Sequence, residues 1–288
     1  MSISGWLSLT ACPACRGVLT ADNDRLACRR CNTHYDRIGT TWDFRPSTMV
    51  RPSDEAAPTK PGWRSAFVRW IYARHNQSPN VHRALSKVLA TIDRDSWGLN
   101  VGSADTVLHP RLVNLDLRPS AHVHALGTAE RLPFSDNSFA CLVSQEVFEH
   151  LANPLCAGRE VARVLRPDGL FYLQVPFIIG SHSTPNDYWR FSGVGLRELV
   201  ERMGLEAVEI GVAVGAGTSM YRISVEYWAA LAAAISRRLY LPAKITAALL
   251  LAPLRWTDVV TSGDNDWNRV QAGFYAIARK VGHGSTKP

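Results

Sequence analysis

Long apolar runs are absent from the sequence. No window of the 288-residue chain reaches about 18 uninterrupted apolar residues, the length that a membrane-spanning helix needs. Residues 1–9 also lack the positive start and the long apolar core of a secretory signal. From these two absences we expect a cytoplasmic protein without a transmembrane helix.

Acidic residues are outnumbered by basic ones. The chain has 32 Lys and Arg against 25 Asp and Glu, a formal net charge of +7 and a pI near 9.3. This balance favours anionic neighbours such as phosphates, nucleic acid or an acidic lipid surface, although net charge alone does not choose among them. With 46% hydrophobic and 20% charged residues, the composition is typical of a globular protein, and 288 residues are enough for one large core or for a small domain plus a core domain.

The centre of the chain alternates short apolar runs with helical patterns. Strands are predicted within residues 96–105, 112–116, 140–144 and 170–177, and the spacing of apolar residues predicts a helix over 147–166. This alternation predicts βαβ crossovers, and hence an α/β fold whose parallel sheet is covered by helices on both faces.

Polar residues stand where the expected strands end, and a parallel sheet binds its ligand at that edge. Gly102 has no Cβ and lets the backbone approach a ligand closely, while Asp116 can accept hydrogen bonds from two vicinal hydroxyls, as a carboxylate facing ribose does. The G-x-G-x-x-G fingerprint of dinucleotide enzymes is lacking, because Ala104 stands where the second glycine would be.

Five motifs occur here in order and at plausible spacing. They are a strand end at Gly102, an acid at Asp116, a polar loop over 128–139, a helix start over 146–151 and a turn into a strand over 165–176. The segment, about residues 97–211, resembles the class I S-adenosylmethionine (SAM)-dependent methyltransferases of the methyltransferase type 11 kind. The resemblance implies a Rossmann-like fold with a mostly parallel seven-stranded sheet, and a methyltransferase (EC 2.1.1.-) that uses SAM.

The resemblance also assigns the cofactor-binding positions. It implies that SAM is held by Asn100, Gly102, Ser103, Ala104, Asp116, Leu117, Thr128, Ala129, Glu130, Ser144 and Gln145. Three of these positions depart from the family pattern: Asn100 replaces its first acid, Ala104 its second glycine, and Thr128 the acid that contacts adenine. Asn100 brings no charge to a cationic cofactor, and Thr128 offers one hydroxyl where a carboxylate would accept from the adenine amine. A degenerate domain kept for binding alone therefore stays an alternative.

Four of the six cysteines form two C-x-x-C pairs near the N-terminus, Cys12, Cys15, Cys28 and Cys31. Two such pairs can surround one tetrahedral Zn²⁺, which supplies folding energy that a small segment lacks, so we predict a structural zinc ribbon over residues 1–45. A pair of disulfides is the alternative, but it is disfavoured in a chain without a signal peptide. His34 is a competing ligand, although four thiolates already complete the site.

Residues 46–62 are rich in proline and are expected to form a linker to a SAM-binding domain over 63–288. The segment 60–94 carries seven Lys or Arg against one acid, and aromatic spacing predicts an amphipathic helix over 63–74, so basic helices are expected across 63–95. These helices could grip RNA or an anionic membrane surface; the alternative is that they cover the sheet edge and the cofactor.

The segment 182–192 follows the predicted strand 170–177 and is dense in polar and aromatic residues. It resembles the H-x-x-P-x-D-Y-W-R-F-T segment of a methyltransferase subgroup associated with polysaccharide and glycoconjugate assembly. We predict His182 as a general base that Asp187 orients, with His150 as the second candidate. The alternative is that Asp187 pairs with Arg190 while the aromatic side chains anchor the loop.

An insert with two apolar stretches is predicted over 218–260. Residues 227–235 and 245–251 are apolar but too short to span a bilayer, so we expect two amphipathic helices. Three roles are open for 223–260: an acceptor pocket, a homodimer face, or a peripheral contact with the inner face of the membrane. A final strand is expected over 273–279.

The leading hypothesis is a SAM-dependent methyltransferase that acts on an oxygen of a sugar-containing or other small hydroxylated metabolite, such as a glycan or glycoconjugate. Such an enzyme aligns the acceptor for in-line displacement and needs a base when the acceptor is a hydroxyl. An RNA methyltransferase is the second hypothesis, but residues 143–146 lack an N-P-P-Y or catalytic-cysteine motif. The third is a non-catalytic binding module.

Overall fold

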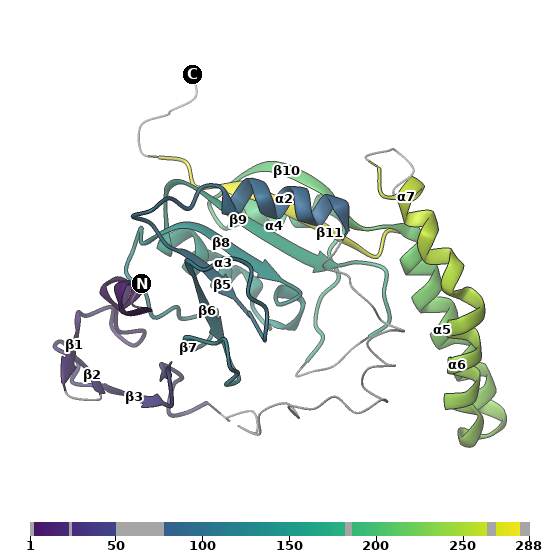
Figure 1. The fold of residues 1–288 in the computed structure, drawn as a ribbon, viewed down its shortest axis with the longest axis horizontal. Coiled ribbons are helices and arrows are strands. Elements are labelled where there is room, and N and C mark those ends of the chain that lie inside the picture. The colour runs from purple at the N-terminus through teal and green to yellow at the C-terminus, as the bar shows by residue number, and fades with distance from the viewer. Residues whose placement is uncertain (1–2, 23–24, 50–77, 182–185, 264–268, 283–288) are drawn as a thin grey trace.

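The computed structural model describes residues 3–22, 25–49, 78–181, 186–263 and 269–282. Figure 1 shows a twisted sheet flanked by helices, a small β-rich unit at one end and a pair of long helices at the other. In chain order the elements are η1 (Ile3–Leu9), β1 (Leu19–Asp22), β2 (Arg25–Cys28), β3 (His34–Ile38), β4 (Thr41–Asp43), α2 (Pro79–Leu89), β5 (Gly98–Val101), β6 (Leu112–Asp116), β7 (Ala125–Leu126), β8 (Phe139–Gln145), η3 (Phe148–His150), α3 (Pro154–Val164), β9 (Leu165–Pro176), α4 (Gly193–Arg202), β10 (Glu206–Val214), α5 (Ala216–Ile235), η4 (Arg237–Leu239), α6 (Tyr240–Leu251), η5 (Ala252–Thr257), α7 (Asp258–Thr261) and β11 (Gly273–Arg279).

The central sheet confirms the expected α/β architecture. Its order is β7-β6-β5-β8-β9-β11-β10, within a longer sheet that continues from β7 through β4 to β1. The pairs from β7 to β9 are parallel, and β11 is antiparallel to both of its neighbours. The carboxyl ends of β5 to β10 therefore lie along one edge, and only β11 runs the other way.

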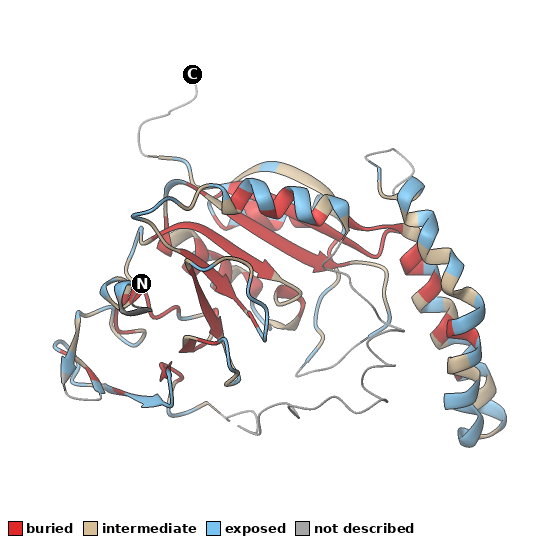
Figure 2. Ribbon diagram, in the orientation of Figure 1, coloured by how far each residue is buried: buried red, intermediate tan, exposed pale blue. Residues whose placement is uncertain are grey.

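Alternating side chains of the central strands supply both halves of the core. On β8, Cys141 and Val143 pack with Val81 and Val88 of α2, whereas Leu142 belongs to the cluster that contains Val161 of α3. This alternation follows from the two-residue period of a strand, because successive side chains point to opposite faces. Strand β8 is accordingly buried along nearly its whole length (Figure 2).

Two predicted boundaries in this region were wrong. The helix expected over 147–166 is shorter, because Asn153 caps α3 with its side chain and Pro154 occupies its first turn, while η3 is a separate short turn. Strand β9 begins at Leu165, earlier than expected, since the chain keeps pairing with β8 across an irregularity that includes Asp168 at φ 62°.

The N-terminal unit is continuous with the sheet. Strand β4 pairs in parallel with β7, and the Thr41 hydroxyl donates to the carbonyl of Val123 at 2.8 Å. Trp6, Tyr35 and Phe44 belong to the same hydrophobic cluster as the strands of the central sheet. Of the expected linker over 46–62, residues 50–62 lie outside the described residues, as does the predicted helix over 63–74; α2 forms within the predicted basic segment 63–95.

The apolar insert forms a helical hairpin. Helix α5 starts directly after β10, at Ala216, and returns through η4 into α6, so the insert is longer than the two stretches recognised in the sequence. Figure 1 shows α5 and α6 side by side, standing away from the sheet. Among the described residues, no helix is long and apolar enough to cross a membrane. The final strand β11 covers the predicted residues 273–279.

Candidate functional site

The predicted cofactor residues converge on the edge where the parallel strands end. Val101 at the end of β5 pairs with Leu115 on β6 and with Ser144 on β8, so the loops that follow these strands are neighbours. Asp116 at the end of β6 lies opposite Leu126, two residues before Thr128. The structure thus brings together the segments around residues 102, 116, 128 and 144.

The Asp116 carboxylate bridges two of these loops. It accepts the backbone N–H of Ala104 at 2.8 Å and that of Arg118 at 3.0 Å. Ala104 reaches this position with φ 45°, in the left-handed region. A carboxylate has about four acceptor positions, so these two bonds leave capacity for further donors such as ribose hydroxyls.

Gly102 is constrained by a protein neighbour. Its φ is 73°, and a Cβ at this position would stand 2.2 Å from Cγ2 of Val147. A side chain at position 102 would therefore collide with Val147, which follows β8, whether or not a ligand is bound.

Two buried hydroxyls point to a polar ligand at this edge. Ser103 and Ser144 are 2% and 0% exposed, and neither Oγ atom has a hydrogen-bond partner within the part of the chain that the structure describes. A buried polar group without a partner costs about 1–3 kcal/mol, and a ligand with donors and acceptors can remove that cost. The residues present therefore fit a polar cofactor beside Asp116.

The residues that depart from the family pattern have structural partners. The Asn100 side chain is buried and donates to the side-chain oxygen of Asn114 at 3.3 Å, while Asn114 donates to the carbonyl of His122 at 2.9 Å. The Thr128 hydroxyl accepts the N–H of Glu130 at 3.2 Å and so fixes the turn after β7. Both side chains hold the strand-end loops in place.

The remaining predicted cofactor positions lie nearby. Ala129 is buried and Glu130 is half-buried in the loop after β7, whereas Gln145 donates to the side-chain oxygen of Gln174 on β9 at 3.1 Å. The carbonyl of Leu117 accepts from the Arg45 guanidinium at 3.1 Å. Arg45 thereby connects the N-terminal unit to the loop that follows Asp116.

Two acidic residues next to β8 have strongly raised pKa values. Desolvation raises the pKa of Glu146 to about 7. A hydrogen bond from Gln174 and the charge of Arg190 lower this pKa but do not cancel the effect of burial. Burial, together with the negative charge of Glu146, raises the pKa of Glu149 to about 9. Glu146 has φ 55°, and its Oε1 accepts from Nε2 of Gln174 at 3.2 Å. Acids of this kind at a ligand edge are candidates for proton transfer.

The loop before α4 closes over these acids. Arg190 forms two hydrogen bonds with Asp187, one of them 2.6 Å between Nη2 and Oδ2, and also donates to the carbonyl of Gly180. Asp187 thus pairs with Arg190, the alternative left open in the sequence, because the guanidinium matches both carboxylate oxygens. That Asp187 also orients His182 stays a prediction. His182 itself lies outside the described residues.

His150 faces the same loop. Its Nδ1 hydrogen bonds with the carbonyl oxygen of Asn186, and its Nε2 lies 3.7 Å from Oε1 of Glu149. The backbone N–H of Tyr188 donates to the carbonyl of Glu149 at 2.8 Å, and the Trp189 indole donates to that of Leu151 at 2.8 Å. These contacts hold the loop against the segment after β8 and leave the rings of Tyr188 and Trp189 partly exposed.

Sequence reasoning missed four residues of this cluster as site residues: Glu146, Glu149, Gln174 and Arg190. A signal was available, because Glu146 and Glu149 are the two acids of the E-V-x-E-H pattern that supported the family resemblance. Their raised pKa values depend on burial by the later loop, which no local pattern encodes.

The four N-terminal cysteines form a compact cluster. Their Sγ atoms all lie within 4.8 Å of one another, with 3.6 Å between Cys12 and Cys31 and 3.4 Å between Cys15 and Cys28. Sulfurs about 2.3 Å from a zinc ion in tetrahedral geometry would stand about 3.8 Å apart, whereas disulfide sulfurs are about 2 Å apart. The four thiols thus fit a tetrahedral metal. His34 is exposed and lies outside this cluster.

Taken with the site, the sheet defines the class of protein. An open sheet with one antiparallel strand, β11, between β9 and β10, and with polar strand ends along one edge, is the Rossmann-like fold of class I methyltransferases. Residues 101–173 match the family described as "Methyltransferase domain", so this stretch of the chain is a methyltransferase domain. The sequence prediction of that family is confirmed.

Curated relatives match parts of the same region. An uncharacterized methyltransferase from Mycolicibacterium gilvum (strain PYR-GCK) is 38% identical over 73 residues, 25% of this chain and 28% of the relative. The uncharacterized methyltransferase YcgJ from Bacillus subtilis (strain 168) is 49% identical over 47 residues, 16% and 19% of the two chains. The matches therefore span less than a third of each relative.

Among solved structures, one similar chain comes from the complex between the Haloferax volcanii Trm112 methyltransferase activator and a methyltransferase. It is 18% identical, the alignment covers 76% of this chain and 96% of that chain, and the TM-score is 0.46.

Proposed function

We propose that this protein transfers the methyl group of SAM to a hydroxyl oxygen of a small sugar-containing or otherwise polyhydroxylated acceptor. The observation that carries the proposal is the pair of buried hydroxyls, Ser103 and Ser144, which have no partners in the described chain. They lie at the ends of β5 and β8, on the same strand-end edge of the methyltransferase domain as Asp116. When bound, SAM supplies the activated methyl group; the residues below bind the reactants, orient them and move the proton.

Cofactor binding is assigned to the loops after β5, β6 and β7. Asp116 accepts from the ribose hydroxyls, and Ser103 and Ser144 bond polar groups of the cofactor with hydroxyls that are otherwise left unsatisfied. Asn100 and Thr128 hold these loops through their bonds to Asn114 and Glu130, which accounts for the absence of acids at both positions.

Proton removal is assigned to Glu146. With a pKa of about 7 it is divided between its two protonation states near neutral pH, which suits a general base, and Gln174 fixes its orientation at 3.2 Å. His182, predicted from the sequence, and His150 are the next candidates. Catalysis otherwise consists of alignment, because methyl transfer is an in-line displacement.

A small neutral acceptor suits the charge of this cluster. Glu146, Glu149 and Asp187 gather on the acceptor side, and the Arg190 guanidinium among them is paired with Asp187. Near neutral pH Glu149, with a pKa of about 9, is protonated, and Arg190 is neutralised by Asp187. Carboxyl groups exchange hydrogen bonds with sugar hydroxyls, whereas a phosphate needs cations, so the cluster favours a polyhydroxylated acceptor over RNA.

Titration of the protein with SAM and with its demethylated product tests the cofactor half of the proposal. The Asp116→Ala variant should bind SAM about 30-fold more weakly, equivalent to about 2 kcal/mol, because a charged hydrogen-bond acceptor is removed. Asp95→Ala, an exposed acid away from this edge, is the matched control and should bind like the wild type.

The outcomes separate the three hypotheses. A wild-type protein that binds neither compound would leave the non-catalytic module as the better explanation, and unchanged affinity in Asp116→Ala would assign the ribose to another residue. Methylation assays with a panel of sugar-containing alcohols and with RNA then decide the acceptor class; methylation of RNA alone would overturn the acceptor proposed here.

A further inference from the structure

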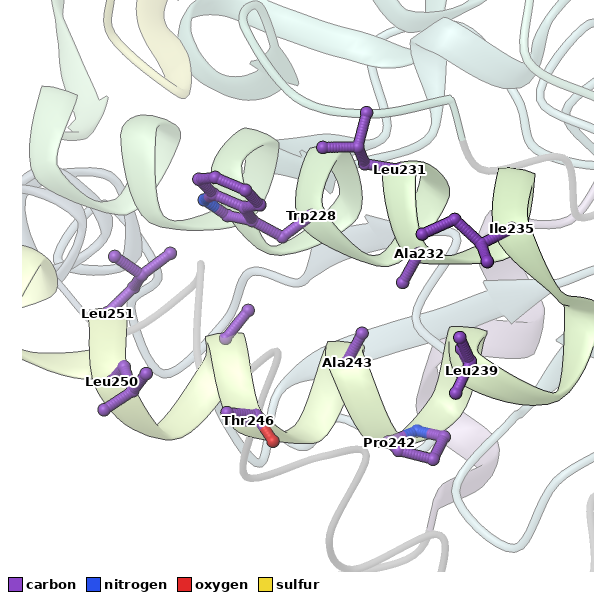
Figure 3. Close-up of a pocket in the computed structure, with 11 residues that line it drawn as sticks. Trp228, Leu231, Ala232, Ile235, Leu239, Pro242, Ala243, Thr246, Leu250 and Leu251 are labelled. Atoms are coloured by element: carbon purple, nitrogen blue, oxygen red, sulfur yellow. The ribbon is translucent and has the colours of Figure 1, made fainter.

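The hairpin of α5, η4 and α6 carries an apolar groove on one side (Figure 3). The groove has a volume of about 670 Å³. It is lined on α5 by Trp228, Leu231 and Ile235, on η4 by Leu239, and on α6 by Leu250 and Leu251, with smaller residues between them. On α5 the lining residues recur at spacings of three and four, so they form a stripe along one face of the helix. We call this face the apolar groove.

The side chains of the groove are unusually exposed. Ile235 is 82% exposed, Leu250 74% and Trp228 52%. The core of the hairpin itself is small, because only Tyr221, Val225, Ala247 and Ala248 form its buried cluster. A helix that is apolar on nearly every side, as α6 is, is normally covered by other protein or by lipid.

Beyond Glu226, the charged residues of the hairpin and of η5 are all basic. Between Glu226 and Asp258 the sequence contains Arg237, Arg238, Lys244 and Arg255 but no acidic residue. Arg237 and Arg238 are exposed at the turn between the helices, and no described carboxylate forms an ion pair with either. Cations beside tryptophan and leucine suit the headgroup region of an anionic lipid layer.

We propose that this hairpin docks on an anionic lipid surface, with the apolar groove in the interface and Arg237 and Arg238 against the headgroups. Neither helix is long and apolar enough to span a bilayer, so the hairpin lies in the interface plane. A second copy of the chain fits less well as the occupant, because it would bring cations against cations without a matching acidic surface.

The opposite side of the hairpin faces the protein, which leaves the groove side outward. Glu226 pairs with Lys244 at 2.6 Å and accepts from the Tyr240 hydroxyl at 2.9 Å, and its Cγ lies close to Gly180 in the loop after β9. Trp228 follows Glu226 by two residues, which places it about 200° around the helix. The Ser219 hydroxyl also anchors α5 by donating to the carbonyl of Ile178 at 2.8 Å.

Co-sedimentation of the full chain with lipid vesicles tests the proposal. We expect the protein to pellet with vesicles of phosphatidylcholine and phosphatidylglycerol, and to stay largely in solution with phosphatidylcholine alone. The double variant Arg237→Gln/Arg238→Gln should bind the anionic vesicles about 25-fold more weakly, about fivefold for each charge near the surface. Ile235→Ser/Leu250→Ser should weaken binding about tenfold or more, since it removes apolar area from the interface.

The matched control is Arg94→Gln/Arg197→Gln, which removes two exposed arginines outside the hairpin and so gives the same net charge. It should bind vesicles like the wild type, and circular dichroism should show that all three variants are folded. The proposal is overturned if the wild type does not bind anionic vesicles, or if the control variant loses as much binding as Arg237→Gln/Arg238→Gln. A dimer seen by sedimentation velocity also overturns the proposal if the Ile235→Ser/Leu250→Ser variant dissociates it, because a second copy of the chain then fills the groove. None of these readouts depends on SAM.

Discussion

The N-terminal cysteine ribbon, residues 1–45, and the helical hairpin are attached to opposite ends of the central sheet, and they are attached in different ways. The ribbon continues the sheet through β4 and shares its hydrophobic cluster, whereas the hairpin leaves β10 as a chain extension with a small core of its own. The ribbon also contacts the loop after β6 through Arg45, and the hairpin contacts the loop after β9 through Ser219. Damage to the ribbon should therefore spread into the central sheet, and damage to the groove should not.

Removal of the metal is expected to have the largest effect. We predict about one zinc per chain, and a Cys12→Ser/Cys28→Ser variant that loses the zinc and about 5 kcal/mol or more of unfolding free energy, because metal binding stabilises the ribbon and the ribbon shares its core with the sheet. Metal analysis and thermal unfolding measure the two effects. Cys156→Ser, an exposed cysteine outside the cluster, is the control. Full zinc content in the double variant would remove the assignment.

Arg45 tests the coupling between the ribbon and the cofactor loop. Its guanidinium is 0% exposed and pairs with Asp43, so Arg45→Met should cost about 3–5 kcal/mol of unfolding free energy by leaving a buried charge unpaired. Adding Asp43→Asn should recover part of that loss. The exposed pair of Arg25 and Asp36 is the comparison, and Arg25→Met should cost less than about 1 kcal/mol in denaturant unfolding. Equal losses in the two variants would contradict a buried ion pair.

Glu146 follows β8, a strand that lies in the sheet between the ribbon and the hairpin. Glu146→Gln should lower turnover about 10²- to 10⁴-fold, because the proton acceptor is lost while the shape is kept. The base acts when ionised, so wild-type turnover should rise as the pH passes through the Glu146 pKa of about 7, and the variant should lose that rise. A product-linked methylation assay across pH measures both, with Glu198→Gln on the exposed face of α4 as the control. Unchanged turnover would transfer the role to His182.

Substitutions in the apolar groove are expected to have the smallest effect on stability. Ile235→Ser and Leu250→Ser should each change the unfolding free energy by less than about 0.5 kcal/mol, since both side chains are already in solvent. Phe44→Ala in the ribbon, where the ring is 2% exposed, should cost about 3–5 kcal/mol. Strong destabilisation by the groove variants in chemical unfolding would show that something covers these side chains in solution.

Local patterns predicted the parts of the fold that depend on short-range chemistry. The two C-x-x-C pairs, the polar strand end at Asp116 and the last strand over 273–279 each carry a signal within a few residues. The pairing of β4 with β7 carries none, because β4 has three residues and the Thr41 hydroxyl finds its acceptor 82 residues away. Tertiary contacts of this kind decide edge strands, whose own propensity is weak.

The same limit applied within the site. Sequence spacing left the pairing of Asp187 with Arg190 open, and the geometry of the folded loop shows it. Helix α5 starts at Ala216, two residues before the predicted insert; the prediction began later because the first turn is made of small residues with no apolar period. The raised pKa values of Glu146 and Glu149 arise from burial, which exists only after the loop has folded over them.

The parallel pairing of β4 with β7 also orders events during synthesis. The cysteines of the ribbon leave the ribosome well before Ala125–Leu126, the segment that β4 must pair with. During that interval β4 has an unpaired edge, which is a template for pairing with other chains. Early capture of the metal by the first 31 residues, which hold all four thiols, would keep the nascent ribbon folded until its docking strand is made. Zinc supply during translation, rather than in the finished protein, would then govern how much of the chain escapes aggregation.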